Sequence, residues 1–360
     1  MTDGNSKLLI NNLMKNRKIK TSVVILNWNG RKLLEQFLPV VLENTLNDET
    51  EVVVADNAST DDSVEFLKSF YPHLPVIILD KNYGFAEGYN KALEQIDSEY
   101  VVLLNSDVET TSNWLTTLIS YMDMHPAVAA VQPKILSYKN KSMFEYAGAA
   151  GGFIDRFGYP FCRGRILDTV EYDNGQYDTE IPLFWATGAC LCIRLKDYNE
   201  AGKLDDGFFA HMEEIDLCWR LNARGRKVFC VPSSKVYHVG AASLKKENPM
   251  KMYLNFRNNL LMLYKNVPQS QLYSTFLVRH TFDFAALMHL LIKGQTKNAK
   301  AVIKAYNSFY SLRKSYKPLR KQNLKKTIVE NIPVQFKRSI LLCYYTGYKT
   351  YDSLISKNKQ

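Results

Sequence analysis

The chain has 360 residues, 46% of them hydrophobic and 23% charged, which is typical of a soluble globular protein with a large core. Its net charge of +10 is concentrated between residues 293 and 330, a segment that contains nine Lys, two Arg and one acidic residue. The rest of the chain is neutral as a whole, and no basic residues gather there around a nucleic-acid-binding motif, so we expect no nucleic-acid partner.

The first twenty residues lack the apolar stretch and small-residue cleavage site of a secretory signal. The six cysteines show neither a C-x-x-C pair nor a zinc-binding spacing. Both observations favour the reducing cytoplasm. The glycosylation sequons at Asn57 and Asn140 are then chance matches.

The first hundred residues alternate between β-branched apolar runs and amphipathic segments. Strands are predicted over residues 21–28, 51–56, 75–80 and 100–107, and helices over 31–44, 60–70 and 84–96. This order predicts an α/β fold whose parallel sheet is covered by helices on both faces, with right-handed crossovers.

After residue 125 the alternation weakens. We predict a strand over 128–136, loops and short strands over 137–183, and a helix over 252–266. An apolar segment, 184–195, contains Thr187-Gly188 in its middle.

Polar residues follow all four early strands: Asn27 to Gly30, Asp56 to Ser59, Asp80 to Asn82, and Asn105 to Asp107. In parallel sheets ligands bind outside the carboxyl ends of the strands. At any one position an ordinary loop or helix cap explains the same residues, so the argument depends on the four ends together. No G-x-G-x-x-G or P-loop motif is present, which argues against a dinucleotide dehydrogenase or a P-loop NTPase.

Seven segments in order carry a resemblance that covers roughly residues 20–265: "SVVILNWNG", "VVADNASTDDS", "NYGFAEGYN", "LLNSDV", "TGAC", "FFAHMEEIDLCWR" and "YHVGAAS". The chain resembles the glycosyltransferase family 2 enzymes with the GT-A fold, especially rhamnosyltransferase-type members that build bacterial surface polysaccharides. The resemblance implies an N-terminal segment (1–19), a GT-A domain with a Rossmann-like mixed sheet (20–266) and a helical basic extension (267–360).

The resemblance also implies inverting transfer of a sugar from a UDP- or dTDP-type donor to a hydroxyl of a glycan or lipid-linked glycan. It places Asp56 against the base, with Asn27 and Asn29 lining the same pocket. Beside the base and ribose it places Asn82, Gly84 and Asn90. Simple packing at a helix start is an equally good explanation of Gly84.

By the same resemblance, Asn105 and Asp107 take the place of an Asp-x-Asp element that holds a metal–diphosphate. The first position is an amide here, which reduces the charge available to a cation. His238 matches a downstream histidine and is the second candidate ligand, although a lone histidine is more often structural. One carboxylate, one imidazole and phosphate oxygens suit Mn²⁺ or Mg²⁺.

The acceptor hydroxyl needs a general base. The resemblance assigns this role to Glu214, with Glu213 as the alternative, and we expect Asp216 to cap the following helix. Acidic residues that complement a helix dipole would look the same. Trp185, Thr187 and Gly188 match a segment that faces the acceptor, although a Trp in an apolar strand usually belongs to the core.

In the C-terminal segment, Lys293, Lys297, Lys300 and Lys304 recur at helical spacing, with Val302, Tyr306 and Phe309 on the opposite side. The apolar stretch 276–294 is interrupted by charges and is no clean membrane span. Both pieces suit a helix lying on an anionic membrane surface, here the inner face of the cytoplasmic membrane, and equally a solvated basic face.

Two other functions remain open from the sequence. A sugar nucleotidyltransferase also uses a parallel sheet and a metal, but "NWNGRK" is a poor match to its glycine-rich loop. A non-catalytic nucleotide-sugar-binding subunit is suggested by the degenerate Asn105-Ser106-Asp107 and by Glu214.

Overall fold

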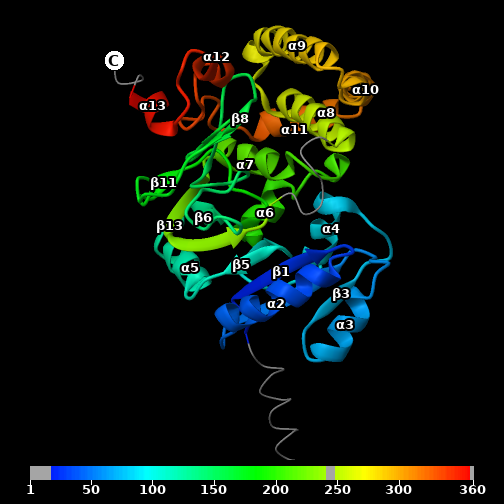
Figure 1. Cartoon of the computed structure of the whole chain (residues 1–360), viewed down its shortest axis with the longest axis vertical. Coiled ribbons are helices and arrows are strands. Elements are labelled where there is room, and N and C mark those ends of the chain that lie inside the picture. Colours follow the sequence, from blue (N-terminus) through cyan, green and yellow to red (C-terminus); the bar gives the residue numbers. More distant parts are fainter. Residues whose placement is uncertain (1–17, 241–247, 357–360) are drawn as a thin grey trace, which may run out of the picture.

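The computed structural model describes residues 18–240 and 248–356, which are built around one large mixed sheet (Figure 1). Nearly all of the expected N-terminal segment, and the last three residues of "YHVGAAS", lie outside the described residues. The chain runs from the sheet into a group of helices at the other end of the molecule.

The large sheet has the order β11-β13-β6-β12-β4-β1-β2-β3, with β5 paired to β13. Its strands are β1 (Thr21–Asn27), β2 (Thr50–Asp56), β3 (Val76–Ile78), β4 (Tyr100–Asn105), β5 (Val108–Thr110), β6 (Val128–Ser137), β11 (Ile181–Pro182), β12 (Cys190–Arg194) and β13 (Lys227–His238). The first four strands are parallel, as predicted, while β12 runs antiparallel between β4 and β6. The sheet is therefore mixed.

Helices cover both faces because successive strand residues point to opposite sides. Val23, Ile25 and Val54 pack with α2, α3 and α5, whereas Val24 and Val53 pack with α4 and α7. These helices are α2 (Arg31–Thr45), α3 (Ser63–Phe70), α4 (Gly84–Leu93), α5 (Trp114–Met124), α6 (Leu195–Ala201) and α7 (Glu213–Ala223).

The segment 137–183 forms short strands and loops, as predicted. A second sheet has the order β10-β9-β8-β7. Its strands are β7 (Gly152–Ile154), β8 (Pro160–Cys162), β9 (Arg165–Ile166) and β10 (Thr169–Val170).

The C-terminal part of the chain is helical. It begins with α8 (Pro249–Asn266), which closes the range expected for the GT-A domain, and continues through the extension with α9 (Gln269–Ile292), α10 (Thr296–Leu312), α11 (Lys317–Lys326), α12 (Ile340–Tyr345) and α13 (Tyr351–Ser356). It shares a core with the rest of the chain, because Leu260, Phe309 and Phe336 belong to the same cluster as the inner face of the sheet. The backbone N–H of Phe336 also donates to the carbonyl of Ile154 at 2.9 Å.

Three boundaries differ from the sequence-based prediction. The apolar segment 184–195 becomes a strand only from Cys190, since a turn at Gly188 and Ala189 interrupts it. Helix α7 begins at Glu213, so Asp216 lies inside its first turn and is not its cap. Lys293 precedes α10, which begins at Thr296.

Candidate active site

The polar ends of the strands meet because β1 lies between β2 and β4. Asn27 is in register with Asp56, and its neighbour Leu26 is in register with Asn105. The N–H of Asn105 donates to the carbonyl of Ala189 at 3.0 Å, which places the turn before β12 next to the end of β4. Strand ends and turn thus form one rim.

Asp56 is almost fully buried at this rim. Its Oδ2 accepts from Nδ2 of Asn27 at 3.0 Å and its Oδ1 from the N–H of Ser59 at 2.9 Å. Oδ1 of Asn27 is buried and has no hydrogen-bond partner among the described residues. A Cβ on Gly30 would lie 2.3 Å from that oxygen, so only glycine leaves it room. An unpaired buried acceptor of this kind is one that a ligand donor can satisfy.

Asn29 joins the two loops at this end of the sheet. It adopts the left-handed backbone conformation, with φ of 52°. Its Oδ1 accepts from the N–H groups of Thr60 at 2.7 Å and Asp61 at 3.3 Å. These contacts show that Asn29 holds the loop after β2 against the loop after β1.

The start of α4 is held by two amides. Oδ1 of Asn82 accepts from the N–H of Gly84 at 2.8 Å, and Asn57 bonds both the N–H of Tyr83 and the carbonyl of Gly84 at 2.9 Å. Gly84 has φ of +73°, and a Cβ there would lie 2.5 Å from the ring of Phe209. The contacts seen for Gly84 are therefore the helix-start packing that was the alternative from sequence, and the place of Asn82 beside the base and ribose stays a prediction.

Asn90 points away from the rim, toward the loop before α7. Its Nδ2 donates to the carbonyl of Leu204 at 2.9 Å and to Asp206, and its Oδ1 accepts from the Tyr198 hydroxyl and from the N–H of Leu204. These bonds use every donor and acceptor site of the amide. Asn90 thus fixes that loop, which corrects its expected place beside the base and ribose.

His238 lies between two carboxylates. Its Nε2 is 3.1 Å from Oδ1 of Asp107 and 3.4 Å from Nδ2 of Asn105, and its Nδ1 is 3.6 Å from Oε1 of Glu145. Burial opposes the charged imidazole, but the two carboxylates outweigh burial and raise the pKa of His238 to about 10. Asp107, Glu145 and His238 are all buried.

The two carboxylates do not converge on one point, since they lie at opposite nitrogens of the ring. Within residues 18–240 and 248–356, no three His, Cys, Asp or Glu side chains are arranged to hold a metal ion. Asp107 and the Nε2 of His238 can offer two ligands to a cation, whose other ligands must come from the substrate or water.

Glu213 and Glu214 are the first two residues of α7, and the pKa of each carboxyl lies above its usual value. Burial raises the pKa of Glu214 to about 7, and burial with the charge of Glu214 raises that of Glu213 well above its usual range. An Oε2 atom of each is buried without a hydrogen-bond partner in the described part of the chain. A Cβ on Gly188 would lie 3.9 Å from the Cβ of Glu214, so Glu214 stands beside the turn that borders the rim.

The loop before α7 is fixed from two sides. Nδ2 of Asn258, on α8, donates to the carbonyls of Phe208 and Ala210 at 2.9 Å and of His211 at 2.7 Å. The carbonyl of Phe209 accepts from the N–H of Phe85 at 2.6 Å, at the start of α4. One loop thus connects α8, the rim and α7.

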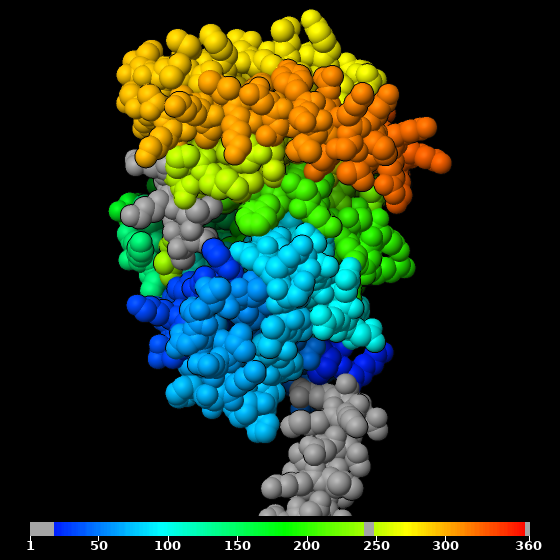
Figure 2. Space-filling view, turned by 90° about the vertical axis from the view of Figure 1, so that its right-hand side faces the viewer, coloured from blue at the N-terminus to red at the C-terminus, as the bar shows by residue number. Residues whose placement is uncertain are grey.

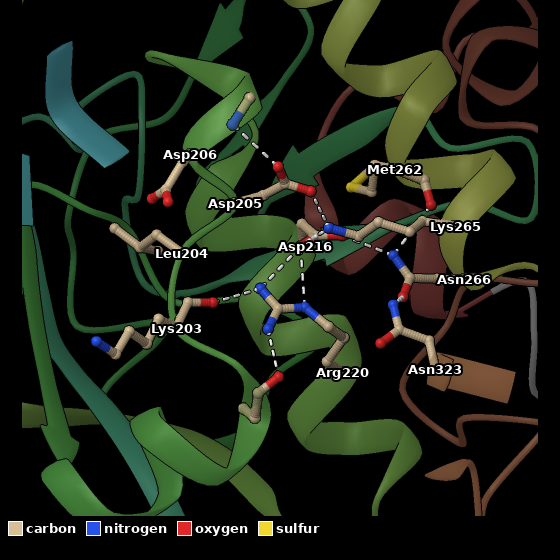
Figure 3. Close-up of polar contacts among 12 residues, drawn as sticks. Lys203, Leu204, Asp205, Asp206, Asp216, Arg220, Met262, Lys265, Asn266 and Asn323 are labelled. Atoms are coloured by element: carbon tan, nitrogen blue, oxygen red, sulfur yellow. Dashed lines mark hydrogen bonds and ion pairs between the residues drawn. The ribbon is translucent and has the colours of Figure 1, made fainter. Parts of the chain in front are cut away.

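Asp216, expected as a helix cap, is instead the centre of a buried ionic network (Figure 3). Its carboxylate accepts from Nε of Arg220 at 2.9 Å, from Nζ of Lys265 at 2.8 Å and from Nδ2 of Asn266 at 2.7 Å. Lys265 also pairs with Asp205. The network joins α7 to α8 behind the two glutamates.

Trp185 and Thr187 occupy different surroundings. Trp185 is buried, its indole N–H donates to the carbonyl of Phe153 at 2.8 Å, and Gly152 lies against its ring. No ring face remains for an acceptor, so Trp185 is a core residue, the alternative kept open above. Thr187 donates to the carbonyl of Ala147 at 2.6 Å and thereby links the turn to the Glu145 loop.

The rim thus brings together Asp56, Asp107, His238 and, through the turn at Gly188, Glu214. Sequence reasoning missed Asn57 and Glu145. Asn57 lay inside a quoted motif and was unassigned. Glu145 carried no signal, because its segment was expected to be loop.

The model of the family described as "Glycosyl transferase family 2" matches residues 22–165, which contain the polar ends of β1, β2 and β4. Residues 22–165 therefore form a domain of glycosyl transferase family 2. The family predicted from the seven motifs is thereby confirmed.

Curated relatives of the chain include rhamnosyltransferases. It is 24% identical over 257 residues to the N-acetylglucosaminyl-diphospho-decaprenol L-rhamnosyltransferase of Mycobacterium tuberculosis, covering 67% of this chain and 83% of the relative. It is 26% identical over 215 residues to Rhamnosyltransferase WbbL of Escherichia coli K12, covering 57% of this chain and 79% of the relative. The rhamnosyltransferase-like character expected from the sequence is confirmed.

Solved structures show the fold. GalNAc-T7 with UDP, GalNAc and Mn²⁺ matches with a TM-score of 0.55 and 18% identity, over 69% of this chain and 49% of that one. S. aureus TarS 1-349 in complex with UDP-GlcNAc matches with a TM-score of 0.52 and 16% identity, over 91% and 92%. The predicted GT-A fold with a helical C-terminal region is confirmed.

Proposed function

We propose that this glycosyltransferase transfers a sugar, with inversion, from a UDP- or dTDP-type nucleotide sugar to a hydroxyl of a glycan acceptor. The observation that carries the proposal is Glu214. The residue is only partly buried, but its Oε2 atom is buried and unpaired among the described residues, and the pKa of its carboxyl is raised to about 7, beside the turn at the rim. A carboxylate with this pKa is suited to general-base catalysis near neutral pH.

In the proposed reaction Glu214 accepts the proton of the acceptor hydroxyl as the oxygen attacks the anomeric carbon. The bond from that carbon to the diphosphate breaks, and the nucleoside diphosphate leaves with the bonding electrons. A single displacement of this kind inverts the anomeric centre. Glu213 is more completely buried and remains the alternative base.

At the other side of the rim we propose that Asp56 accepts the imide N–H of the base. Asn27 holds that carboxylate in place and offers its free oxygen to a ligand donor. Asn29, Asn82 and Gly84 shape the walls of this pocket through the loops described above.

A divalent cation, Mn²⁺ or Mg²⁺, fits the residues present. Asp107 and His238 are adjacent, buried and joined at Nε2, and once the ring has given up its Nε2 proton they would supply one oxygen and one nitrogen ligand. The GT-A structure of GalNAc-T7 carries Mn²⁺ together with UDP. A bound cation would neutralise charge on the departing diphosphate. Asn105 adds an amide next to the same site.

We propose that the acceptor is lipid-linked and that the product serves surface polysaccharide synthesis. The support is the relative named for a decaprenol-linked acceptor. The six cysteines are free and buried, which fits the cytoplasm.

A thermal-shift panel of UDP-, dTDP- and GDP-sugars, with and without Mn²⁺, tests donor and metal together. We expect a shift with a uracil or thymine nucleotide that grows with Mn²⁺. Release of nucleoside diphosphate supports sugar transfer, and release of pyrophosphate identifies a nucleotidyltransferase instead. Binding without turnover of any donor and acceptor identifies a non-catalytic subunit.

A further inference from the structure

Helix α9 is packed with its polar side inward. Arg279 and Asp283 are buried and joined by bonds of 2.9 Å from Nε to both carboxylate oxygens. Asp283 also accepts from the hydroxyls of Tyr159 at 2.9 Å and Tyr306 at 2.7 Å. The side of α9 that contacts the rest of the protein therefore carries its charged side chains.

The apolar side of α9 faces outward. The exposed fractions are 81% for Tyr273, 57% for Leu277, 63% for Phe284, 41% for Met288 and 82% for Ile292. Such a row is unusual for a free surface, because contiguous exposed apolar patches mark interaction sites.

The apolar row continues onto α10. The hydroxyl of Tyr310 lies 2.7 Å from Nε2 of His280, so the exposed Tyr310 adjoins α9. Ile303, seven residues earlier on α10, is exposed on the same side of that helix. We call these apolar residues of α9 and α10, with Lys293, Lys297 and Lys300, the α9–α10 face.

The charge of this region has one sign. From residue 269 to 329 the sequence contains one acidic residue, Asp283, and that carboxylate is buried in its ion pair. Lys293, Lys297 and Lys300 are exposed. Figure 2 shows α9 in yellow along one end of the molecule with α10 in orange beside it. The region therefore exposes apolar and cationic groups and no carboxylate.

We propose that the α9–α10 face docks onto an anionic lipid bilayer surface. Exposed apolar side chains enter the boundary between headgroups and acyl chains, and nearby lysines pair with anionic headgroups. This docking does not depend on the proposed sugar transfer. It does give a lipid-linked acceptor a reason to meet the protein at the membrane.

By length and hydropathy α9 is also able to cross a membrane. Spanning would require its Arg279–Asp283 pair to leave Asn259, Tyr159 and Tyr306, to which it is bonded. Unpairing those buried charges is costly. The face therefore lies on the bilayer.

Vesicle sedimentation with the full chain tests the docking. We expect binding to vesicles of equal parts phosphatidylglycerol and phosphatidylcholine, weakened by salt, and little binding to phosphatidylcholine alone. Changing Lys293, Lys297 and Lys300 together to Gln lowers the partition coefficient about 100-fold. The matched control changes Lys32, Lys68 and Lys196, which are also exposed, and leaves binding unchanged.

The apolar contribution has its own pair of variants. Phe284→Glu with Met288→Glu abolishes binding, whereas Phe70→Glu with Met124→Glu, at positions 69% and 70% exposed, does not. Circular dichroism verifies that each variant is folded. No binding to anionic vesicles at low salt, or equal loss with both pairs, overturns the proposal. If the protein stays in the membrane after washing with alkaline carbonate, α9 spans the bilayer. If the protein forms a dimer that only Phe284→Glu disrupts, a second copy covers the face. Either result also overturns the proposal.

Discussion

The Nδ1 atom of His238 lies 3.6 Å from Oε1 of Glu145, on the side of the ring opposite Asp107. Glu145 is held in turn, because its Oε2 accepts from the N–H of Ala147 at 2.5 Å. A carboxylate on the outer nitrogen fixes the ring of a metal-binding histidine and makes the inner nitrogen a better ligand. At 3.6 Å the contact is between charges and is no hydrogen bond, and we predict that Glu145 orients the His238 ring through it.

Replacing Glu145 with Gln should weaken Mn²⁺ binding 10- to 100-fold, by about the loss found when such carboxylates are removed. Isothermal titration of Mn²⁺ into the protein with UDP measures this. UDP binding without Mn²⁺ should stay unchanged, which a general distortion of the site would not allow. Glu109→Gln, at a half-buried carboxylate on the neighbouring strand β5, is the control. Equal Mn²⁺ affinity in both variants would contradict the positioning role.

Substitutions at Asn105 and Asp107 should change the affinity for Mn²⁺ in opposite directions. Asp107→Asn removes the carboxylate at Nε2 of His238 and should abolish the Mn²⁺-dependent part of the thermal shift with UDP. Asn105→Asp adds a second carboxylate beside it and should tighten Mn²⁺ binding about tenfold, because ligand charge increases affinity for hard cations. Weaker binding by Asn105→Asp would show that the amide is needed as a donor.

Glu214→Gln should lower kcat by about 10²- to 10⁴-fold, the usual contribution of a general base. Nucleotide-sugar binding, followed by thermal shift, should remain because Glu214 lies on the acceptor side of the rim. Glu200→Gln, an exposed glutamate on α6, serves as the control. If Glu214→Gln retains turnover while Glu213→Gln loses it, the base assignment moves to Glu213.

The raised pKa of Glu214 predicts two pH effects. Activity requires the ionised form, so kcat/KM should rise with pH and level off above about 7. In the unfolded chain the pKa of this carboxyl is near its usual value of 4.5, and folding raises it to about 7. Its stabilising contribution is therefore complete below pH 4.5 and is lost as pH rises through 7.

At pH 8 the free energy of unfolding measured in urea should accordingly be higher for the Glu214→Gln variant than for the unaltered protein, by about 1–3 kcal/mol. The difference should vanish at pH 4. A difference that does not change with pH would exclude a buried, titrating carboxyl at this position.

Lys265→Met should destabilise the fold by about 3–5 kcal/mol, because it leaves Asp216 and Asp205 buried with one cation fewer. Urea unfolding measures this. Lys203→Met is the control, since the Lys203–Glu94 pair is exposed and contributes less than about 1 kcal/mol. Similar losses in both would mean that the network in Figure 3 does not bear on stability.

The early strands were predictable because each is a short β-branched run ended by polar residues. Their parallel order then placed Asp56 and Asn105 on either side of β1 without any knowledge of side chains. His238 and Glu214 were placed by the motifs of the family, and both reach the same rim in space.

The remaining differences have a common physical cause, which is contact between residues distant in sequence. Asn90 was misplaced because its partners Leu204 and Asp206 come more than a hundred residues later. Asp216 was predicted to be a helix cap, but in the structure Lys265, on α8 and 49 residues later in the sequence, neutralises it. Only the folded chain shows that α9 buries its charges and exposes its apolar side.

The three carbonyls that Asn258 holds have a consequence for protein engineering. Helix α8 is hydrogen-bonded to the loop before α7, and that loop also contacts α4. Exchanging the C-terminal helices between relatives at a junction near residue 250 would therefore break these bonds. A hybrid enzyme must inherit that loop and the C-terminal helices from the same parent. Crossovers placed upstream of residue 203 keep the two together.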